Sequence, residues 1–266
     1  MTPPIFTPDG TEVEEVILPD GSTAAEVIAP DGTVVFEGDV IPDSLTDNFD
    51  LWWRYNEASG SVVADHFDNS NADKDLESPS WVSDGDAFDG EYLFFDGADH
   101  VKSQNKLTAN SQEYCAFVMF FHPTYDSGNS EFLLEADSET TLGEDRQNGW
   151  VVLTRNESVR LNHADGGSTV TGGRVEFSDV SGGEWLFAGA TGDGDSMEIY
   201  LWSESEFLGS GSGSEPRGVT NDAGVMTGAS IEDSNHLDEG GIATVGIGST
   251  TVTQSDFAEI KDFIIP

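Results

Sequence analysis

The run from Tyr114 to Phe121 is apolar at every position (Tyr-Cys-Ala-Phe-Val-Met-Phe-Phe). Because successive side chains of a strand point to opposite faces, such a strand needs apolar cover on both sides, which two stacked sheets provide. Shorter runs rich in Val, Ile, Phe, Tyr and Trp recur from Phe49 onward between clusters of Gly, Asp, Ser and Asn, without a convincing amphipathic helix period. We therefore predict an all-β domain over residues 49–266, built as a large jelly-roll β-sandwich.

The other strand candidates are short and closely spaced. The clearest are Leu51–Asn56, Tyr92–Phe95, Phe132–Glu135, Trp150–Thr154, Val159–His163, Trp185–Ala190, Met197–Trp202, Ile242–Ile247 and Ile260–Ile265. The repeat Gly209-Ser-Gly-Ser-Gly-Ser214 is instead predicted to be a flexible loop. It is not a phosphate-binding loop, because no Lys and no following helix accompany it.

The acidic composition limits the partners of the protein. The 266 residues include 10 basic and 51 acidic side chains, and the formal net charge is −41. This chain lacks the basic footprint that nucleic-acid binding needs, and an anionic membrane surface would repel it. Disorder is disfavoured, because 36% of the residues are hydrophobic and 10% are aromatic. Molar salt screens repulsion among unpaired carboxylates, so the composition indicates a high-salt environment, such as that of a halophilic archaeon.

The cysteine content and the N-terminal sequence bear on the compartment. Cys115 is the one cysteine, which excludes an internal disulfide and a cysteine-rich zinc site, and its apolar neighbours in sequence predict a buried, inert thiol. No Lys or Arg precedes Arg54, and no apolar stretch approaches the roughly 18 residues of a membrane span. We therefore expect a protein made and kept in the cytoplasm, unless a leader has been removed.

Residues 8–40 contain an internal repeat with a period of 11. Pro-Asp-Gly triplets begin at Pro8, Pro19 and Pro30, and each precedes a run rich in Thr, Val and Ile. Proline presets a turn and Asp-Gly tolerates positive φ, so each unit predicts a turn followed by a short strand. Three such strands bury too little to fold alone. We expect residues 1–46 to be a stem or anchor, or alternatively a small sheet folded onto the main domain, with a linker over 39–48.

Five motifs follow one another in the order of a known family. They are Leu51-Trp-Trp-Arg-Tyr-Asn-Glu57 with Ser59-Gly-Ser-Val-Val-Ala-Asp65, the Gly- and aromatic-rich segment Ala87–Val101, the strand Phe117-Val-Met-Phe-Phe-His-Pro123, the Trp-led hairpin Trp185–Trp202, and the closing strand Phe257–Ile265. In this order, residues 49–266 resemble a LamG-type, concanavalin A-like lectin/glucanase domain. The resemblance implies a glycan-binding or adhesive sandwich. Ser203-Glu-Ser stands where the family usually has Asp-Gly, so we expect a reshaped turn there.

The acidic loop from Asp65 to Asp75 is a candidate cation site. Hard cations take carboxylate and amide oxygens as ligands, and the loop offers both, although the EF-hand spacing with its central Gly is absent. The resemblance also implies a Ca²⁺ ion on the rim of the sandwich near this loop. The candidate ligands are Asp65, Asp68, Asn71 and Asp73. The alternative is a solvated acidic loop, which this composition readily produces.

A glycoside hydrolase is one alternative function on this fold. Laminarinase-type enzymes of similar fold carry Glu-x-Asp-x-Glu on one strand, where the period of two puts the acids on the same face. Glu135-Ala-Asp-Ser-Glu139 matches this pattern formally. Its small intervening residues and the loop-like sequence after it argue against a catalytic strand, and chance suffices among 51 acids. We therefore expect a protein that is not an enzyme.

Tryptophans are candidate platforms for sugar stacking, but most lie in predicted strands and therefore belong to the core. Trp52 and Trp53 are adjacent, so alternation allows only one of the two to point inward. The pair is therefore worth examining, but the ligand-binding residues are unknown from the sequence.

Adhesive domains of this kind usually work outside cells, yet this chain shows no export signal. Release of assembled virus particles by lysis of the host cell would reconcile the two observations. We therefore expect a structural protein on the virion surface of a halophilic archaeal virus, such as a turret, spike or tail fibre. Its lectin-like head would attach to host surface glycans, with Ca²⁺ as the candidate cofactor. Its partners would be a homo-oligomer of itself and other virion proteins, with no nucleic acid and no membrane. The alternative is an extracellular or cell-surface carbohydrate-binding adhesin of a haloarchaeon.

Overall fold

The computed structural model of this chain divides into two compact units, Met1–Thr46 and Asp47–Pro266. The residues that it describes are 26–28, 34–37, 43–55, 61–67, 72–74, 79–83, 91–97, 99–105, 113–125, 128–137, 148–165, 168–177, 180, 182–214, 224–229 and 236–265. Within these ranges, no helix has the length and apolar character needed to cross a membrane.

The first unit contains a short hairpin. β1 (Glu26–Ile28) pairs antiparallel with β2 (Val34–Glu37), in the runs predicted after the second and third Pro-Asp-Gly triplets. The run after the first triplet lies outside the described residues. The predicted linker 39–48 contains one turn of helix, α1 (Asp43–Thr46), which starts directly after Pro42 in the sequence. Proline is tolerated at helix starts, so it does not prevent this turn. The role of residues 1–46 as a stem stays a prediction.

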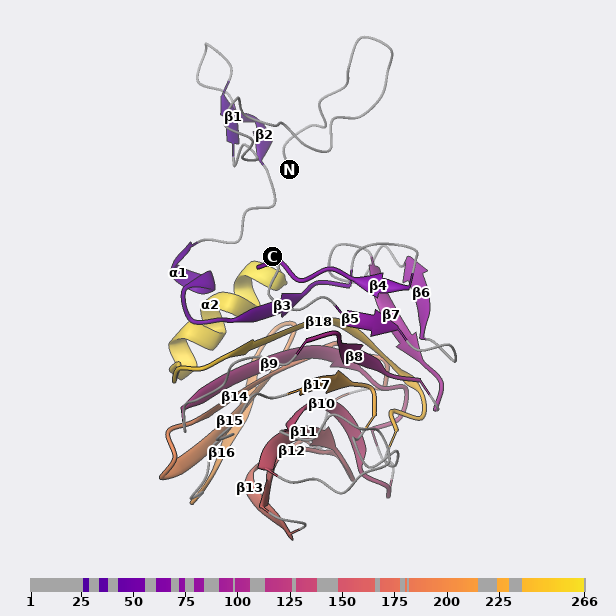
Figure 1. The fold of residues 1–266 in the computed structure, drawn as a ribbon, viewed down its shortest axis with the longest axis vertical. Coiled ribbons are helices and arrows are strands. Elements are labelled where there is room, and N and C mark those ends of the chain that lie inside the picture. The colour runs from indigo at the N-terminus through magenta and orange to yellow at the C-terminus, as the bar shows by residue number, and fades with distance from the viewer. Residues whose placement is uncertain are drawn as a thin grey trace. The chain divides into compact units, whose positions relative to one another are not determined.

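The second unit is a sandwich of two antiparallel sheets (Figure 1). We call one of them the helix-covered sheet, in the order β16-β15-β14-β9-β18-β7-β6, with β3 also paired to β18. Its strands are β3 (Leu51–Trp53), β6 (Ser80–Ser83), β7 (Glu91–Phe95), β9 (Tyr114–Phe121), β14 (Leu186–Gly192), β15 (Ser196–Ser203), β16 (Phe207–Ser214) and β18 (Gly240–Gly248).

The opposite sheet has the order β13-β12-β11-β10-β17-β8-β5-β4. Its strands are β4 (Val62–Val63), β5 (Ala72–Lys74), β8 (Val101–Ser103), β10 (Glu131–Asp137), β11 (Asn148–Thr154), β12 (Ser158–Asp165), β13 (Ser168–Glu176) and β17 (Gly224–Thr227). The two sheets together confirm the predicted all-β jelly-roll sandwich.

The main core lies between the sheets and is built by alternation along each strand. Val118 and Phe120 of β9 meet Leu134 and Trp150 from the opposite sheet, and all four side chains are at most 2% exposed. The ring of Trp150 stacks on Tyr114 with centroids 5.3 Å apart. Each fully buried side chain of this size contributes about 1.5–3 kcal/mol to the free energy of unfolding. Phe117, which precedes Val118, faces the other way and is also buried, so the prediction that β9 is covered on both sides is confirmed.

Helix α2 (Gln254–Ile264) corrects the prediction of a closing strand over Phe257–Ile265. Thr253 caps the helix: its hydroxyl accepts from the backbone N–H of Asp256, whose carboxylate in turn accepts from the N–H of Thr253. Phe257, Ile260 and Ile264 recur at spacings of three and four and are all buried. The reciprocal cap and this apolar face select a helix over the strand that the β-branched residues suggest.

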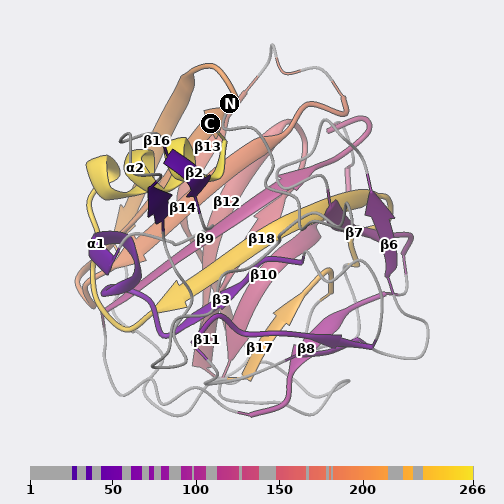
Figure 2. The ribbon, with the colours of Figure 1, turned by 90° about the horizontal axis from the view of Figure 1, so that it is seen from above.

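Helix α2 covers the outer face of its sheet, the face turned away from the other sheet. Figure 2 shows α2 over the strands that include β14, and a Cβ placed on Gly189 of β14 would lie 2.6 Å from the ring of Phe257. An aromatic layer continues across this outer face. It comprises Trp52, Phe117, Phe187 and Trp202, whose rings meet at centroid distances of 4.8–5.8 Å.

The Gly-Ser repeat 209–214 is a strand, β16, and not the predicted loop. Its glycines face β13 of the other sheet at close range. A Cβ on Gly211 would lie 2.1 Å from the carbonyl oxygen of Arg174, and one on Gly213 would lie 2.7 Å from Gly172. The alternation of Gly and Ser therefore brings the edge strands of the two sheets together without side chains between them.

Candidate functional site

A pocket of about 380 Å³ opens where the β14–β15 hairpin meets the start of α2. Most of its lining residues carry hydroxyl or carboxylate groups. They are Thr191, Gly192, Asp193, Ser196, Glu198, Tyr200, Thr251, Val252 and Thr253. The pocket therefore sits at one end of the helix-covered face, and its walls come from β14, β15 and the segment that leads into α2.

The hairpin turn forms one wall through Asp193. Its Oδ1 accepts from the backbone N–H groups of Asp195, at 2.9 Å, and Ser196, at 2.7 Å, while Gly194 takes the positive φ of 88° that the turn requires. These backbone hydrogen bonds, with a further one from the Ser196 hydroxyl, lower the pKa of Asp193. The carboxylate is therefore held in its charged form in the exposed turn.

Tyr200 forms the floor together with Glu198. The two residues are separated by one position on β15, so they share the outer face of the sheet, and the Tyr200 hydroxyl donates to the Glu198 carboxylate. The Tyr200 ring packs against Trp202 and Phe257, with centroids 6.0 and 5.9 Å away. Burial, followed by the hydrogen bond and charge of Glu198, raises the pKa of Tyr200. The phenol therefore stays protonated and acts as a donor.

Thr191 joins the strand to the segment before α2. Its hydroxyl donates to the carbonyl oxygen of Tyr114 at 3.1 Å and accepts from the N–H of Val252 at 3.4 Å. Since Val252 immediately precedes the helix cap Thr253, this contact fixes the start of α2 beside the hairpin.

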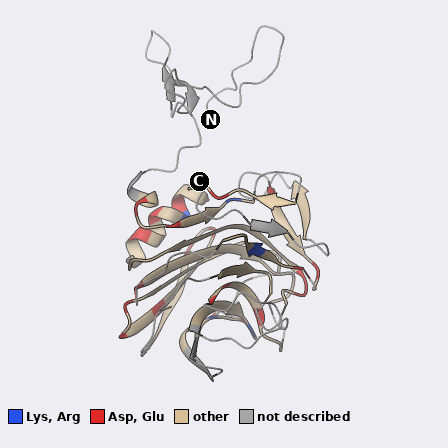
Figure 3. Ribbon diagram, viewed as in Figure 1, with Lys and Arg blue, Asp and Glu red and all other residues tan. Residues whose placement is uncertain are grey.

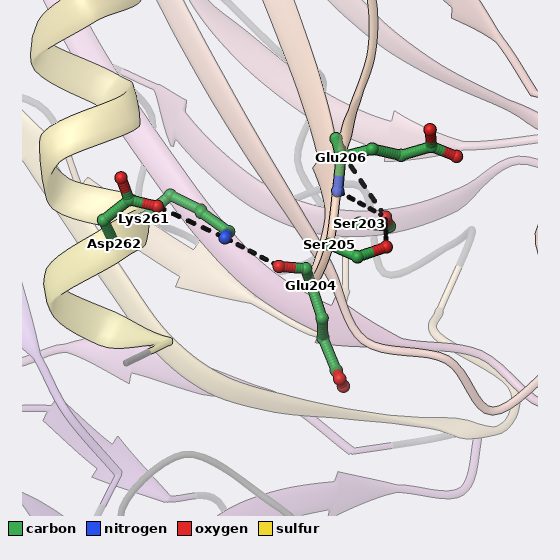
Figure 4. A network of polar contacts seen from close by, with 6 residues as sticks. All are labelled: Ser203, Glu204, Ser205, Glu206, Lys261 and Asp262. Atoms are coloured by element: carbon green, nitrogen blue, oxygen red, sulfur yellow. Dashed lines mark hydrogen bonds and ion pairs between the residues drawn. The ribbon is translucent and has the colours of Figure 1, made fainter.

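The other end of α2 is anchored by a lysine. Lys261 donates to the backbone carbonyl of Glu204 at 2.7 Å and lies 3.3 Å from the carboxylate of Asp262 (Figure 4). Glu204 belongs to the turn between β15 and β16, where Ser203 bonds the backbone N–H of Glu206. The turn after Trp202, which we expected to be reshaped, thus serves as the docking point for the helix.

The pocket suits a ligand rich in hydroxyl groups. Carboxylates at Asp193 and Glu198 accept hydrogen bonds and Tyr200 adds an aromatic ring, while the hydroxyls of Thr191 and Thr253 are already bonded within the protein. None of the described residues that line the pocket is basic. This arrangement favours a neutral polyol over an anion.

The predicted calcium ligands are only partly described. Asp65 is 4% exposed, and its Oδ1 accepts from the N–H groups of Trp52, at 2.9 Å, and Phe67, at 3.3 Å. Asp68, Asn71 and the side chain of Asp73 lie outside the described residues. Among the residues that are described, no group of three or more His, Cys, Asp or Glu side chains could hold a metal ion. Asp65 thus has a structural role at this turn, and the calcium site stays a prediction.

The predicted carboxylate triplet is also partly described. Glu135 and Asp137 are each 1% exposed and share the outer face of β10, whereas Leu134 and Ala136 between them face the core. β10 thus runs two residues beyond the predicted strand Phe132–Glu135. Glu139 lies outside the described residues. The structure therefore brings two of the three acids together.

Trp52 and Trp53 point to opposite faces, as alternation requires. Trp53 belongs to the main core, and Trp52 lies in the aromatic layer with its indole N–H donating to the hydroxyl of Thr244 at 2.9 Å. Both are at most 1% exposed, so neither is a sugar platform. The aromatic residue at the pocket is Tyr200, which sequence reasoning missed inside the predicted strand Met197–Trp202. The one signal was the polar Glu198 two positions before it.

Comparisons with known proteins identify the fold. No protein-family model and no curated protein matches the chain. Among solved structures, the binding domain of botulinum neurotoxin DC in complex with SialylT matches with a TM-score of 0.59 and 9% identity, over 83% of this chain and 52% of that chain. The receptor binding domain of botulinum neurotoxin D gives a TM-score of 0.57 and 14% identity, over 82% and 53%.

A third structure is the ligand binding domain of botulinum neurotoxin serotype D in complex with N-acetylneuraminic acid. It matches with a TM-score of 0.56 and 13% identity, over 82% of this chain and 52% of that chain. This chain therefore spans about half the length of the solved structures that it matches. Likeness at this level of identity shows a shared β-sandwich fold and nothing finer.

Proposed function

We propose that the protein is a non-enzymatic glycan-binding module that holds a neutral saccharide in the pocket beside Tyr200. The observation that carries the proposal is the lining itself, in which two carboxylates, several hydroxyls and one aromatic ring surround a volume suited to one or two sugar rings. Glu198 would accept from sugar hydroxyls while Tyr200 offers its ring edge and hydroxyl. Asp193, already charged, would accept at the opposite wall.

Receptor domains of similar fold support a binding role. The neurotoxin domains are described in complex with SialylT and with N-acetylneuraminic acid, so this sandwich occurs in proteins that bind saccharides. This support concerns the architecture, because the chain matches about half of each of those domains. It favours carbohydrate binding over catalysis, and the LamG resemblance of residues 49–266 points the same way.

The proposed setting is the surface of a virion that infects a halophilic archaeon, with residues 1–46 assembling as a homo-oligomer or on other virion proteins. Its support is the net charge of −41 and the Pro-Asp-Gly repeat. A haloarchaeal adhesin is the alternative. If the high-salt setting is right, thermal unfolding moves to higher temperature from tenths molar to molar NaCl, and Ca²⁺ raises it further if Asp65, Asp68, Asn71 and Asp73 bind it.

A glycoside hydrolase is the second candidate, because Glu135 and Asp137 share one face of β10. The two candidates differ in what happens to the saccharide: a hydrolase cleaves it, whereas a binding module releases it intact. Glu135→Gln would abolish hydrolysis by an enzyme and would leave binding in the Tyr200 pocket unchanged.

A glycan array probed with the full chain in molar NaCl tests the main proposal. We expect binding of neutral oligosaccharides, without cleavage. Glu198→Gln should weaken that binding about ten-fold, since it removes a charged acceptor. The matched control is Glu206→Gln, an exposed acid in the turn after the other end of β15, which should leave binding unchanged. Failure of the folded protein to bind any saccharide, or equal effects of the two variants, would overturn the proposal.

A further inference from the structure

Three of the ten basic residues lie on or directly before one strand pair, β12–β13, of a chain with 51 acidic residues; Figure 3 colours the positions of basic and acidic residues along the ribbon. Arg160 lies on β12, Arg174 on β13, and Arg155 precedes the turn that begins β12. In a chain with 51 acidic residues, a meeting of three arginines is unexpected. We call these three residues the arginine cluster.

Register places two of the arginines directly opposite each other. Arg160 pairs with Arg174 across β12 and β13. Val159, Leu161 and Val175, their neighbours in sequence, all face the core, so the two arginines project from the outer face of the opposite sheet. Like charges that are directly opposed in a sheet are destabilising. A sequence with so few basic residues therefore maintains an unfavourable pair at this position.

The local partners only partly neutralise the cluster. Arg174, which is 41% exposed at its side chain, lies 2.6 Å from the carboxylate of Glu176. Arg160 donates through Nε to the hydroxyl of Ser158 at 3.2 Å, and no described carboxylate forms an ion pair with it. Burial, then the charges of Arg174 and Arg155, lower the pKa of Arg160, whereas Glu176 raises it. The guanidinium remains charged at neutral pH, because its ordinary pKa is far higher.

An amide lies beside the guanidinium groups. Asn162 follows Arg160 by two positions on β12 and therefore projects from the same face. Its Oδ1 is buried and has no hydrogen-bond partner among the described residues. A buried amide oxygen without a partner costs free energy, and a hydroxyl donor from a ligand would satisfy it once the side chain turns outward from this buried position.

We infer that Arg160, Arg174 and Asn162, assisted by Arg155, form a second binding site for the anionic group of an acidic saccharide. The planar guanidinium groups match the oxygens of a carboxylate or a sulfate, and Asn162 accepts from an adjacent sugar hydroxyl. The combination of an anion receptor and a hydroxyl acceptor distinguishes a saccharide from a simple inorganic anion. A long polyanion is excluded, because the acidic surface around the cluster repels it.

This site is independent of the proposed neutral-saccharide pocket. The pocket belongs to β14, β15 and the start of α2 on the helix-covered sheet, whereas the arginine cluster belongs to the opposite sheet. Loss of one site leaves the other intact, so failure of one proposal does not decide the other.

Isothermal titration of the full chain with three tetrasaccharides at fixed ionic strength tests the inference. The probes are a hyaluronan tetrasaccharide, its carboxyl-reduced neutral form, and a sulfated galactan tetrasaccharide. We expect at least one acidic probe to bind about ten-fold more tightly than the neutral form. Preference for the carboxylated or the sulfated probe identifies the anionic group.

Two variants and a control complete the test. Arg160→Gln and Arg174→Gln should each weaken binding of the acidic probe about ten-fold, whereas Lys102→Gln, which removes a charge from β8 of the same sheet, should change it less than about two-fold. Thermal unfolding of Arg174→Gln should occur at the wild-type temperature or above, because the variant relieves like-charge repulsion. Equal binding of acidic and neutral probes, no binding by the folded wild type, or equal effects of all three variants would overturn the inference.

Discussion

The outer faces of the two sheets are built for different tasks. On the helix-covered sheet, Trp52, Phe117 and Trp202 form an aromatic layer, and Phe257 of α2 packs onto Gly189. On the opposite sheet, a buried apolar cluster of Phe132, Val151 and Leu153 shares that face with charged and polar side chains. They include Lys102, Glu135, Asp137, Arg160, Asn162 and Arg174. A sandwich needs only its facing surfaces for a core, so each outer face is free either to add stability or to contact ligands.

The pocket combines the two roles of an outer face, stabilisation and ligand contact. Its floor residue Tyr200 contacts Phe257 of the aromatic layer, while its rim at Asp193 is exposed. The cover supplied by α2 therefore shapes the site as well as stabilising the sheet.

Removing the Phe257 ring, which packs α2 onto the sheet, should give the largest loss of stability. Phe257 is fully buried, so Phe257→Ala should lower the free energy of unfolding by about 3–5 kcal/mol in chemical denaturation. Phe207→Ala is the matched control, because that ring is 41% exposed, and its cost should stay below about 1 kcal/mol. Similar losses in both variants would show that α2 does not stabilise this face more than an exposed ring does.

Adding a methyl group where the edge strands β13 and β16 meet should lower the free energy of unfolding by less. Gly211→Ala would place a Cβ 2.1 Å from the carbonyl of Arg174, and we expect a loss of about 2–3 kcal/mol as the backbone shifts. Gly128→Ala has no atom within 4 Å of its new Cβ and should change stability by less than about 0.5 kcal/mol. Tolerance of the methyl group at Gly211 would contradict the close approach of β13 and β16.

Removing the contact between α2 and the β15–β16 turn should cause a smaller loss of stability still. Lys261→Met keeps the volume of the side chain but loses the hydrogen bond to the Glu204 carbonyl, and should cost about 1.5 kcal/mol. Asp262→Asn removes only a largely exposed charge 3.3 Å from Lys261 and should be nearly neutral. Denaturation curves of the two variants would coincide if the lysine contributed only through its ion pair.

The smallest effect concerns acid stability at the pocket rim. Because the pKa of Asp193 is lowered in the folded state, its contribution is present above the unfolded pKa of about 4 and is lost as pH falls through the folded value. Asp193→Asn should therefore lose less stability than the wild type on acidification. Asp195→Asn changes a carboxylate outside these hydrogen bonds and should follow the wild-type pH profile. Thermal unfolding between neutral and acid pH measures the difference.

The sequence predicted the features that depend on alternation. It placed β9 between two layers and set Trp52 opposite Trp53, because the period of two is a local property of a strand. It ended the strand of Glu135 at that residue, whereas β10 continues to Asp137. Helix α2 was missed because Ile260–Ile265 is rich in β-branched residues, although Thr253 and Asp256 carry a capping pattern.

The remaining errors arose from tertiary contacts. The glycines at 209, 211 and 213 are typical of a loop by propensity, whereas antiparallel pairing with β15 makes this segment a strand and the close approach of β13 leaves no room for side chains at 211 and 213. The pocket gave no motif, because its hydroxyl and carboxylate residues come from two separate segments, 191–200 and 251–253, that only the folded chain brings together.

A crystal structure of the full chain with the tightest neutral saccharide from the array tests the central claim most directly. The account predicts a sugar ring beside Tyr200, with its hydroxyl groups bonded to Glu198 and Asp193 at the start of α2. A saccharide bound instead on the outer face of the opposite sheet, against Glu135 and Asp137, would contradict it.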